Sequence, residues 1–160
     1  MTMLSEHDLG HWTLCKDVKG ATAFKDTFDQ SKYFGFLYCI KNNTTGQFYI
    51  GKKQFFHGGR KKSKTYGKEM TWRTYQGSSS HVKDDIRKLG HDKFTFEMID
   101  LYRTKGGLYY AEAWTQMVSD AMTRTLDGKT PESYNKQIAA IRFVPRESPK
   151  MGTRKYAVKL

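Results

Sequence analysis

Cysteine is scarce in this 160-residue sequence, which contains only Cys15 and Cys39. Two cysteines with no cluster of other ligands around them build neither a disulfide framework nor a zinc site. Cys39 lies in a segment with the composition of a β-strand, so we expect it to be a small core residue. The sequence therefore indicates a reducing compartment and excludes the class of small disulfide-stapled domains.

Long apolar runs are also missing from the sequence. No stretch reaches the roughly 20 apolar residues that a membrane-spanning helix needs. The first 19 residues include acidic side chains and lack the apolar stretch of a signal peptide. We therefore expect a cytoplasmic protein that has no membrane partner.

Acidic residues are few, since 16 Asp and Glu stand against 28 Lys and Arg, which gives a net charge of +12. Such a surplus favours a polyanionic partner, most often nucleic acid. Basic ribosomal proteins and membrane-surface proteins share this property. The charge therefore indicates a class of partner and no particular reaction. The length of the chain is that of one domain.

The positive charge is concentrated in two stretches. Residues 52–68 contain seven basic residues and no acid, and the Gly58-Gly59 pair predicts a flexible loop. Residues 142–160 contain six basic residues and one acid, which predicts a flexible basic C-terminal tail. The first stretch also carries aromatic residues, so we expect it to follow a phosphate backbone. Its expected nucleic-acid contacts are Lys52, Lys53, Arg60, Lys61, Lys62 and Lys64.

Two aromatic and β-branched segments, residues 35–41 and 47–53, flank the turn-forming run from Asn42 to Gly46. This pattern predicts a β-hairpin. Alternation along the strands places Leu37 and Cys39 on one face and Phe36, Tyr38 and Ile40 on the other. With a four-residue loop, Tyr38 and Tyr49 are expected to lie directly opposite each other.

Four further elements are predicted from pattern alone. A short helix is expected over 21–28, and a helix over 82–89 begins after a serine N-cap and ends at Gly90. Residues 93–102 alternate as a strand, and residues 108–125 form a helix. The inward residues of the two longer helices are expected to be Val82, Ile86 and Leu89, and then Ala111, Trp114, Met117, Val118 and Ala121 or Met122. Trp72 is expected in the core.

The hairpin carries a resemblance to a known family. Tyr49-Ile50-Gly51 is similar to the second half of the motif that names the GIY-YIG endonucleases, and Phe36-Leu37-Tyr38 stands where the first half stands. Glu112, on the helix after the third strand, and Asn135, in Ser-Tyr-Asn, extend the resemblance over about residues 34–138. It implies an α+β fold with a small antiparallel three-stranded sheet flanked by helices, in the order β-β-α-β-α. The expected organisation is an extension over 1–33, a nuclease domain over 34–141 and the basic tail.

The resemblance also implies roles for the site residues. Tyr38 or Tyr49 would be the general base, and Glu112 would hold one Mg²⁺ or Mn²⁺ ion. Arg73 is the first choice for the catalytic arginine, and Arg60 is the alternative. By pKa a histidine suits general base catalysis better than a tyrosine, so His81 or His57 could serve instead. We expect Asn135 to brace a loop.

The expected function is a magnesium-dependent DNA endonuclease of phage, homing or restriction type that leaves 5′-phosphate and 3′-hydroxyl ends. It would act on double-stranded DNA as a monomer or homodimer, in a bacterial or phage-infected cell. One alternative is a basic module that binds DNA or RNA without cutting it. Another is a ribosome-associated or RNA-binding protein.

Overall fold

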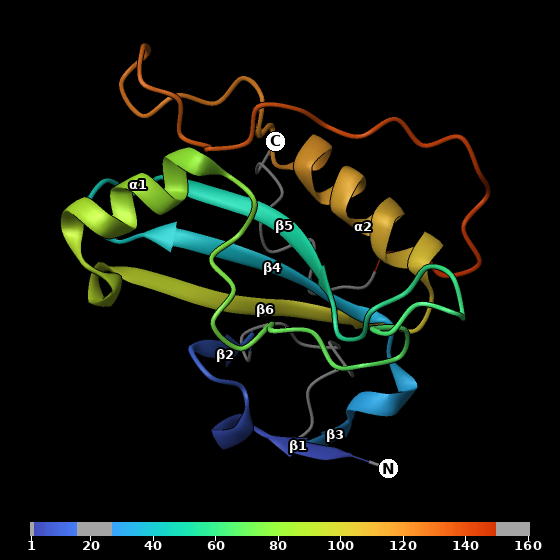
Figure 1. Ribbon diagram of the computed structural model, residues 1–160. Coiled ribbons are helices and arrows are strands. Elements are labelled where there is room, and N and C mark those ends of the chain that lie inside the picture. The colour runs from blue at the N-terminus through green and yellow to red at the C-terminus, as the bar shows by residue number, and fades with distance from the viewer. Residues whose placement is uncertain (1, 16–26, 150–160) are drawn as a thin grey trace.

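A mixed four-stranded sheet forms the centre of the computed structural model, which describes residues 2–15 and 27–149 (Figure 1). The strand order is β2 (Trp12–Leu14), β6 (Phe94–Tyr102), β4 (Gly35–Asn42) and β5 (Phe48–Gln54). β4 runs antiparallel to both of its neighbours, whereas β2 runs parallel to β6. The α+β class is confirmed, but the predicted sheet lacked the fourth strand, β2.

The N-terminal segment is part of this fold. β1 (Met3–Ser5) pairs with β3 (Thr27–Asp29) in a second, two-stranded sheet, and Leu4, Leu9 and Trp12 are buried in the same core as Phe36. Short 3-10 turns lie at Glu6–Asp8, Gln30–Lys32 and His91–Lys93. The helix expected over 21–28 falls largely outside the described residues, and its last two residues lie in β3.

The hairpin of β4 and β5 has the predicted faces but a different register. Tyr38 pairs with Gly51, and Tyr49 pairs with Ile40, so the predicted pairing of Tyr38 with Tyr49 is wrong by two residues. Asn42 remains in β4, where its side-chain oxygen accepts hydrogen bonds from the backbone N–H groups of Thr44 and Thr45. A shift by two residues keeps every side chain on its face, so both tyrosines stay on the same side.

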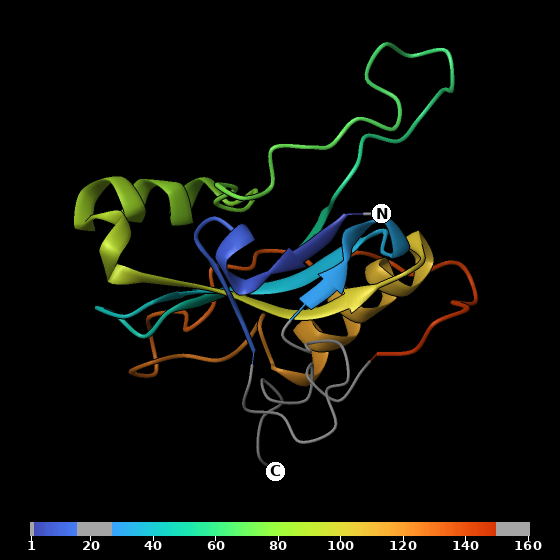
Figure 2. The ribbon, with the colours of Figure 1, turned by 90° about the horizontal axis from the view of Figure 1, so that it is seen from below.

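The two faces of the sheet are covered by different elements (Figure 2). Leu37, Cys39 and Ile50 pack with Leu108 and Ala111 of α2 (Lys105–Val118). The opposite face, with Phe36 and Tyr38, packs against the N-terminal segment, Trp72 and α1 (Ser80–Leu89). Trp72 and Cys39 are buried as predicted.

The ends of α1 were predicted more accurately than the residues that the two helices bury. Ser79 caps α1 by accepting a hydrogen bond from the Val82 N–H, and Gly90 ends the helix. Val82 and Ile86 are buried as predicted, whereas Leu89 is 37% exposed. Leu89 is the last residue of α1 before Gly90, and Val82 and Ile86, but not Leu89, belong to the buried core cluster.

The set of inward residues predicted for 108–125 is confirmed only in part, since Ala111 and Ala121 are buried. The helix covers residues 105–118 rather than 108–125, Met117 is 65% exposed and Trp114 is only half-buried. Glu112, Thr115 and Gln116 are buried instead. Gln116 Nε2 donates to the Ile50 carbonyl over 3.0 Å, so α2 turns part of its polar side toward β5.

The described part of the C-terminal tail packs against the start of α2. The Glu147 carboxylate accepts hydrogen bonds from the backbone N–H groups of Arg103 and Thr104, at 3.0–3.1 Å. A carboxylate at this position stabilises the helix N-terminus. Residues 142–149 therefore do not form the free basic tail that was predicted, and residues 150–160 lie outside the described residues.

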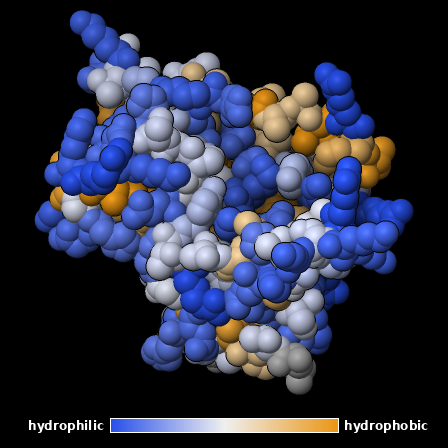
Figure 3. All heavy atoms as spheres, in the orientation of Figure 1, coloured by the Kyte–Doolittle hydropathy of each residue, from blue (hydrophilic) through white to orange (hydrophobic). Residues whose placement is uncertain are grey.

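The surface agrees with the composition, since hydrophilic side chains cover most of the face shown in Figure 3. Among the described residues, no helix combines the length and the apolarity that a membrane span requires.

Candidate active site

A pocket of about 340 Å³ lies along β5, the edge strand of the sheet. β4 and β5, the loop before α1 and the helix α2 all contribute side chains to it. Its polar lining consists of Tyr38, Tyr49, Lys52, Lys53, Gln54, Tyr75, Ser78, Tyr109 and Glu112. The structure thus brings Tyr38, Tyr49 and Glu112 together from three elements, although 63 residues separate Tyr49 from Glu112 in the sequence.

Glu112 is the carboxylate of this pocket. It is 9% exposed, and its Oε1 accepts a 2.8 Å hydrogen bond from Lys52 Nζ. The same ammonium lies 4.2 Å from the centre of the Tyr109 ring. A lone helical glutamate is usually solvated, so its burial beside a paired lysine is a specific feature of this site.

The two motif tyrosines lie side by side, with ring centroids 6.2 Å apart. Glycine makes this packing possible, because a Cβ atom on Gly51 would lie 2.4 Å from the Tyr38 hydroxyl oxygen. Tyr38 is 1% exposed, whereas Tyr49 is half-buried and shares a 2.7 Å hydrogen bond with the Ser78 hydroxyl. A β-bulge in the pairing of β4 with β6 lies next to Tyr38, as is common beside active sites.

Burial raises the pKa of Tyr38 well above its ordinary value and also raises the pKa of Tyr49. General base catalysis by a tyrosine would require the opposite direction. Both side chains are therefore neutral hydroxyls at neutral pH. A neutral tyrosine hydroxyl can both donate and accept a hydrogen bond.

Tyr75 and Ser78 are site residues that the sequence did not reveal. The Tyr75 hydroxyl hydrogen-bonds with Tyr38, and burial raises the pKa of Tyr75. Gly77, at φ +83°, turns this loop against both motif tyrosines. The Gly77-Ser78 pair predicts a turn before the helix. It does not predict where the side chain of Tyr75 points.

Neither candidate arginine lines the pocket. Arg73 Nη1 donates to Glu69 over 2.7 Å, its Nε donates to the Asp8 carbonyl over 2.8 Å, and the guanidinium stacks on Trp72. These contacts tie the loop to the N-terminal segment. Arg60 is exposed in the projecting segment described below.

The two candidate histidines lie apart from each other. His81 lines a second pocket of about 280 Å³ that is also lined by Tyr49 and Ser78, so it lies near Tyr49 but outside the first pocket. His57 lies at the base of the projecting segment, where its backbone pairs with Lys68 and Gly67. The structure therefore brings His81, and not His57, close to the motif tyrosines.

Asn135 braces β5 from its outer edge. Its Oδ1 accepts from the Ile50 N–H over 3.0 Å, and its Nδ2 donates to the Ile50 carbonyl over 2.8 Å. Ser133 Oγ donates to the same Oδ1. The side-chain amide thus pairs with the Ile50 backbone in the way that a neighbouring strand would. This pairing holds the segment that carries Tyr49 and Gly51.

We expect Asn135→Ala to lower the free energy of unfolding by about 1–3 kcal/mol, because the buried Ile50 peptide groups lose their partner. Chemical denaturation measures the change. Gln137→Ala is the matched control, since Gln137 is an exposed amide two residues away. An equal effect of both substitutions would contradict the bracing role.

Residues 57–68, here called the basic arm, project from the body of the molecule (Figure 2). Phe56 bridges to Glu69 at its base, and Gly67 N–H donates to the His57 carbonyl. The charged residues of the arm are all exposed: Arg60, Lys61, Lys62, Lys64 and Lys68. Lys52 and Lys53, which the predicted strand over 47–53 and the predicted loop over 52–68 both included, lie in β5.

The family model described as "Putative endonuclease segE, GIY-YIG domain" matches residues 18–138. The chain belongs to the GIY-YIG endonuclease family. The predicted resemblance began at residue 34, so the family match adds part of the N-terminal segment to the domain.

One relative is the "Putative endonuclease segC" of Enterobacteria phage T4, which is 28% identical over 119 residues. The match covers 73% of this chain and 48% of the relative, so the chain spans about half the length of this curated relative. No solved structure matches the chain significantly.

The donor set of this GIY-YIG domain fits one hard divalent cation. Among the described residues, no group of three or more His, Cys, Asp or Glu side chains could form a protein cage. Mg²⁺ binds through one or two carboxylates and keeps several waters, and Glu112 offers one carboxylate in an open pocket with hydroxyl groups nearby. The residues present therefore suit Mg²⁺ or Mn²⁺ and do not suit a structural zinc ion.

Proposed function

We propose that this GIY-YIG domain is a Mg²⁺-dependent endonuclease that hydrolyses double-stranded DNA and leaves 5′-phosphate and 3′-hydroxyl ends. One observation carries the proposal: Tyr38, Tyr49 and Glu112 line a single pocket at the edge of the sheet. The net charge of +12 and the exposed basic arm support a polyanionic substrate. The protein would act as a monomer or homodimer.

The reaction breaks the bond between phosphorus and the 3′ oxygen. A water molecule attacks the phosphorus, its proton passes to a base, and the departing 3′ oxygen takes up a proton. Glu112 would hold the metal ion, which, when bound, stabilises the charge on the phosphate and on the leaving oxygen. The half-exposed Tyr49 hydroxyl, held by Ser78, would orient the attacking water.

The proton acceptor is assigned to His81 in this proposal. The pKa of both motif tyrosines is raised by burial, so neither is deprotonated and able to accept the proton of the water at neutral pH. His81 lies in the pocket on the other side of Tyr49 and has the residue type suited to this task. Single-turnover cleavage tests the assignment, because His81→Gln should lower the rate by about 10²–10⁴-fold, the usual contribution of general base catalysis.

Plasmid nicking tests the proposed function directly. Supercoiled plasmid should be converted to nicked or linear product with Mg²⁺ or Mn²⁺ and remain intact with EDTA. Religation by DNA ligase without prior kinase treatment would show the 5′-phosphate and 3′-hydroxyl ends. DNA binding without any cleavage would favour the alternative of a non-catalytic nucleic-acid-binding module.

The basic arm gives a prediction about salt. Each phosphate that a protein cation neutralises contributes about −0.9 to the slope of log affinity against log salt concentration. Changing Lys61, Lys62 and Lys64 together to alanine should therefore flatten this slope by up to about 2.7 and weaken binding to all sequences alike. Fluorescence anisotropy with unrelated duplexes measures both effects, and an unchanged slope would remove the arm from the DNA-binding surface.

A further inference from the structure

The two lysines of the pocket have different surroundings. Lys52 forms an ion pair with Glu112. Among the described residues, Lys53 forms no ion pair and instead places its Nζ 4.2 Å from the centre of the Tyr75 ring. One cation of the pocket is therefore neutralised by the protein itself, and the other is not.

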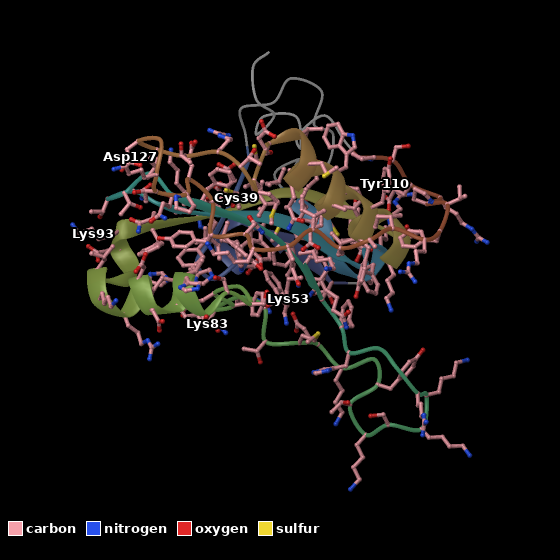
Figure 4. All side chains as sticks on the ribbon, turned by 90° about the horizontal axis from the view of Figure 1, so that it is seen from above. Cys39, Lys53, Lys83, Lys93, Tyr110 and Asp127 are labelled. Carbon is pink, nitrogen blue, oxygen red and sulfur yellow. The ribbon has the colours of Figure 1, made fainter. Side chains whose placement is uncertain are left out.

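The strand geometry explains this difference. Successive side chains of a strand point to opposite faces, so Lys52 extends toward α2 while Lys53 extends toward the face that carries Tyr38. Because β5 is the edge strand, both long side chains reach the same pocket. Figure 4 shows Lys53 where β5 leaves the sheet toward the basic arm.

Tyr75 is held firmly beneath Lys53. Its carbonyl oxygen accepts a 2.9 Å hydrogen bond from His11 Nε2, and its hydroxyl hydrogen-bonds with the buried Tyr38. His11 in turn stacks on Phe96, with ring centroids 3.8 Å apart. The Tyr75 ring thus presents a fixed π-face, which attracts an ammonium group.

The position of Lys53 leaves its charge partly desolvated. Burial lowers the pKa of Lys53, which is the expected effect on a cation that loses water and gains no anion. A phosphate entering the pocket would supply that anion. Neither candidate arginine lines the pocket that such a phosphate would enter, because Arg73 is bound to Glu69 and Arg60 is in the basic arm.

We propose that Lys53, seated on the Tyr75 ring, is the cation that contacts the non-bridging oxygens of the scissile phosphate, in the place expected for the family's arginine. This inference rests on the proposed nuclease function. Lys53 is then a catalytic residue, because it touches the reacting group, and Tyr75 is a positioning residue that acts through Lys53. Lys52 stays with Glu112.

Single-turnover cleavage at saturating DNA tests the role of Lys53. Lys53→Met should lower the rate about 100-fold, the effect of losing one preorganised group that stabilises transition-state charge, and should leave the folding transition unchanged. Lys53→Arg keeps the charge and should restore most of this loss. Tyr75→Phe keeps the π-face and should be mild, whereas Tyr75→Leu should resemble Lys53→Met. Lys83→Met, on α1 and outside the pocket, is the matched control.

A titration with inorganic phosphate without metal gives a second readout that does not need cleavage. Phosphate should shift the NMR signals of the Tyr75 ring in the wild type and in Lys83→Met, and should not do so in Lys53→Met. Wild-type cleavage together with a mild Lys53→Met and a severe Arg73→Ala would overturn the inference and leave the proposed function intact. Absence of wild-type cleavage would defeat the proposed function, and the titration would still decide whether Lys53 binds phosphate.

Discussion

Glu112→Ala should lower the single-turnover cleavage rate by more than about 100-fold, because the pocket loses the carboxylate that would hold the metal, an interaction that contributes several kcal/mol. Glu112→Gln should be nearly as severe, since it keeps the shape of the side chain and loses the charge. Affinity for DNA should stay the same or rise, because Lys52 would no longer be neutralised by Glu112. Cleavage and anisotropy measurements on the same preparations separate the two effects.

The matched control for Glu112 is Asp92→Ala, which removes a carboxylate that is 80% exposed and does not line the pocket. Its cleavage rate and its DNA affinity should equal those of the wild type. Full activity in both Glu112 variants would remove Glu112 from the site. A loss of folding in Glu112→Ala, seen by circular dichroism, would shift the test to Glu112→Gln and to the double variant with Lys52→Met, which leaves no buried charge unpaired.

Gly51→Ala should damage both catalysis and stability. The added Cβ atom would lie 2.4 Å from the Tyr38 hydroxyl oxygen and 2.9 Å from Cε1 of Tyr49. Tyr38 is fully buried and is also packed against Gly77, so it has little room to move. We expect a cleavage rate about 100-fold lower, the effect of a displacement of about 1 Å in a catalytic group, and a loss of about 1–3 kcal/mol in stability from overpacking.

Gly106→Ala is the control for the same addition of one carbon. Its Cβ would meet only the half-exposed Phe143 ring, at 3.3 Å, and alanine favours the helix by about 1 kcal/mol over glycine. The protein should therefore be as stable as the wild type or slightly more stable, with unchanged cleavage. A Gly51→Ala variant with normal activity would show that the close packing of the two tyrosines is not needed for catalysis.

Several features of this protein follow from local patterns in the sequence. The alternation of Leu37 and Cys39 against Phe36, Tyr38 and Ile40 was enough to assign both faces of β4, because a strand has a period of two whatever it packs against. The ends of α1 followed from Ser79 and Gly90, since caps depend on residues within one turn. The family motif lies in the same hairpin, and for this reason the family was recognisable from the sequence.

Other features depended on contacts between distant segments. The register predicted from the turn sequence was wrong by two residues, and in the structure Asn42 stays in β4 while its side chain accepts hydrogen bonds from the turn. The side of α2 that faces the sheet was set by β5, whose Ile50 carbonyl accepts from Gln116, and not by the apolar residues of the helix alone. The strand β2 could not be recognised, because three residues are too short to show a period.

The sequence by itself determined the order of the main elements from β4 to α2, the faces of the hairpin and the residue types proposed for the chemistry. Only the tertiary structure decided which charged groups converge. Lys53 rather than Arg73 lines the pocket because β5 is an edge strand, whereas Arg73 is drawn to Glu69 and to the Asp8 carbonyl. A local sequence pattern predicts on which face of its own helix or strand a side chain lies. Which side chains from different elements meet depends on tertiary packing, which a local pattern does not encode.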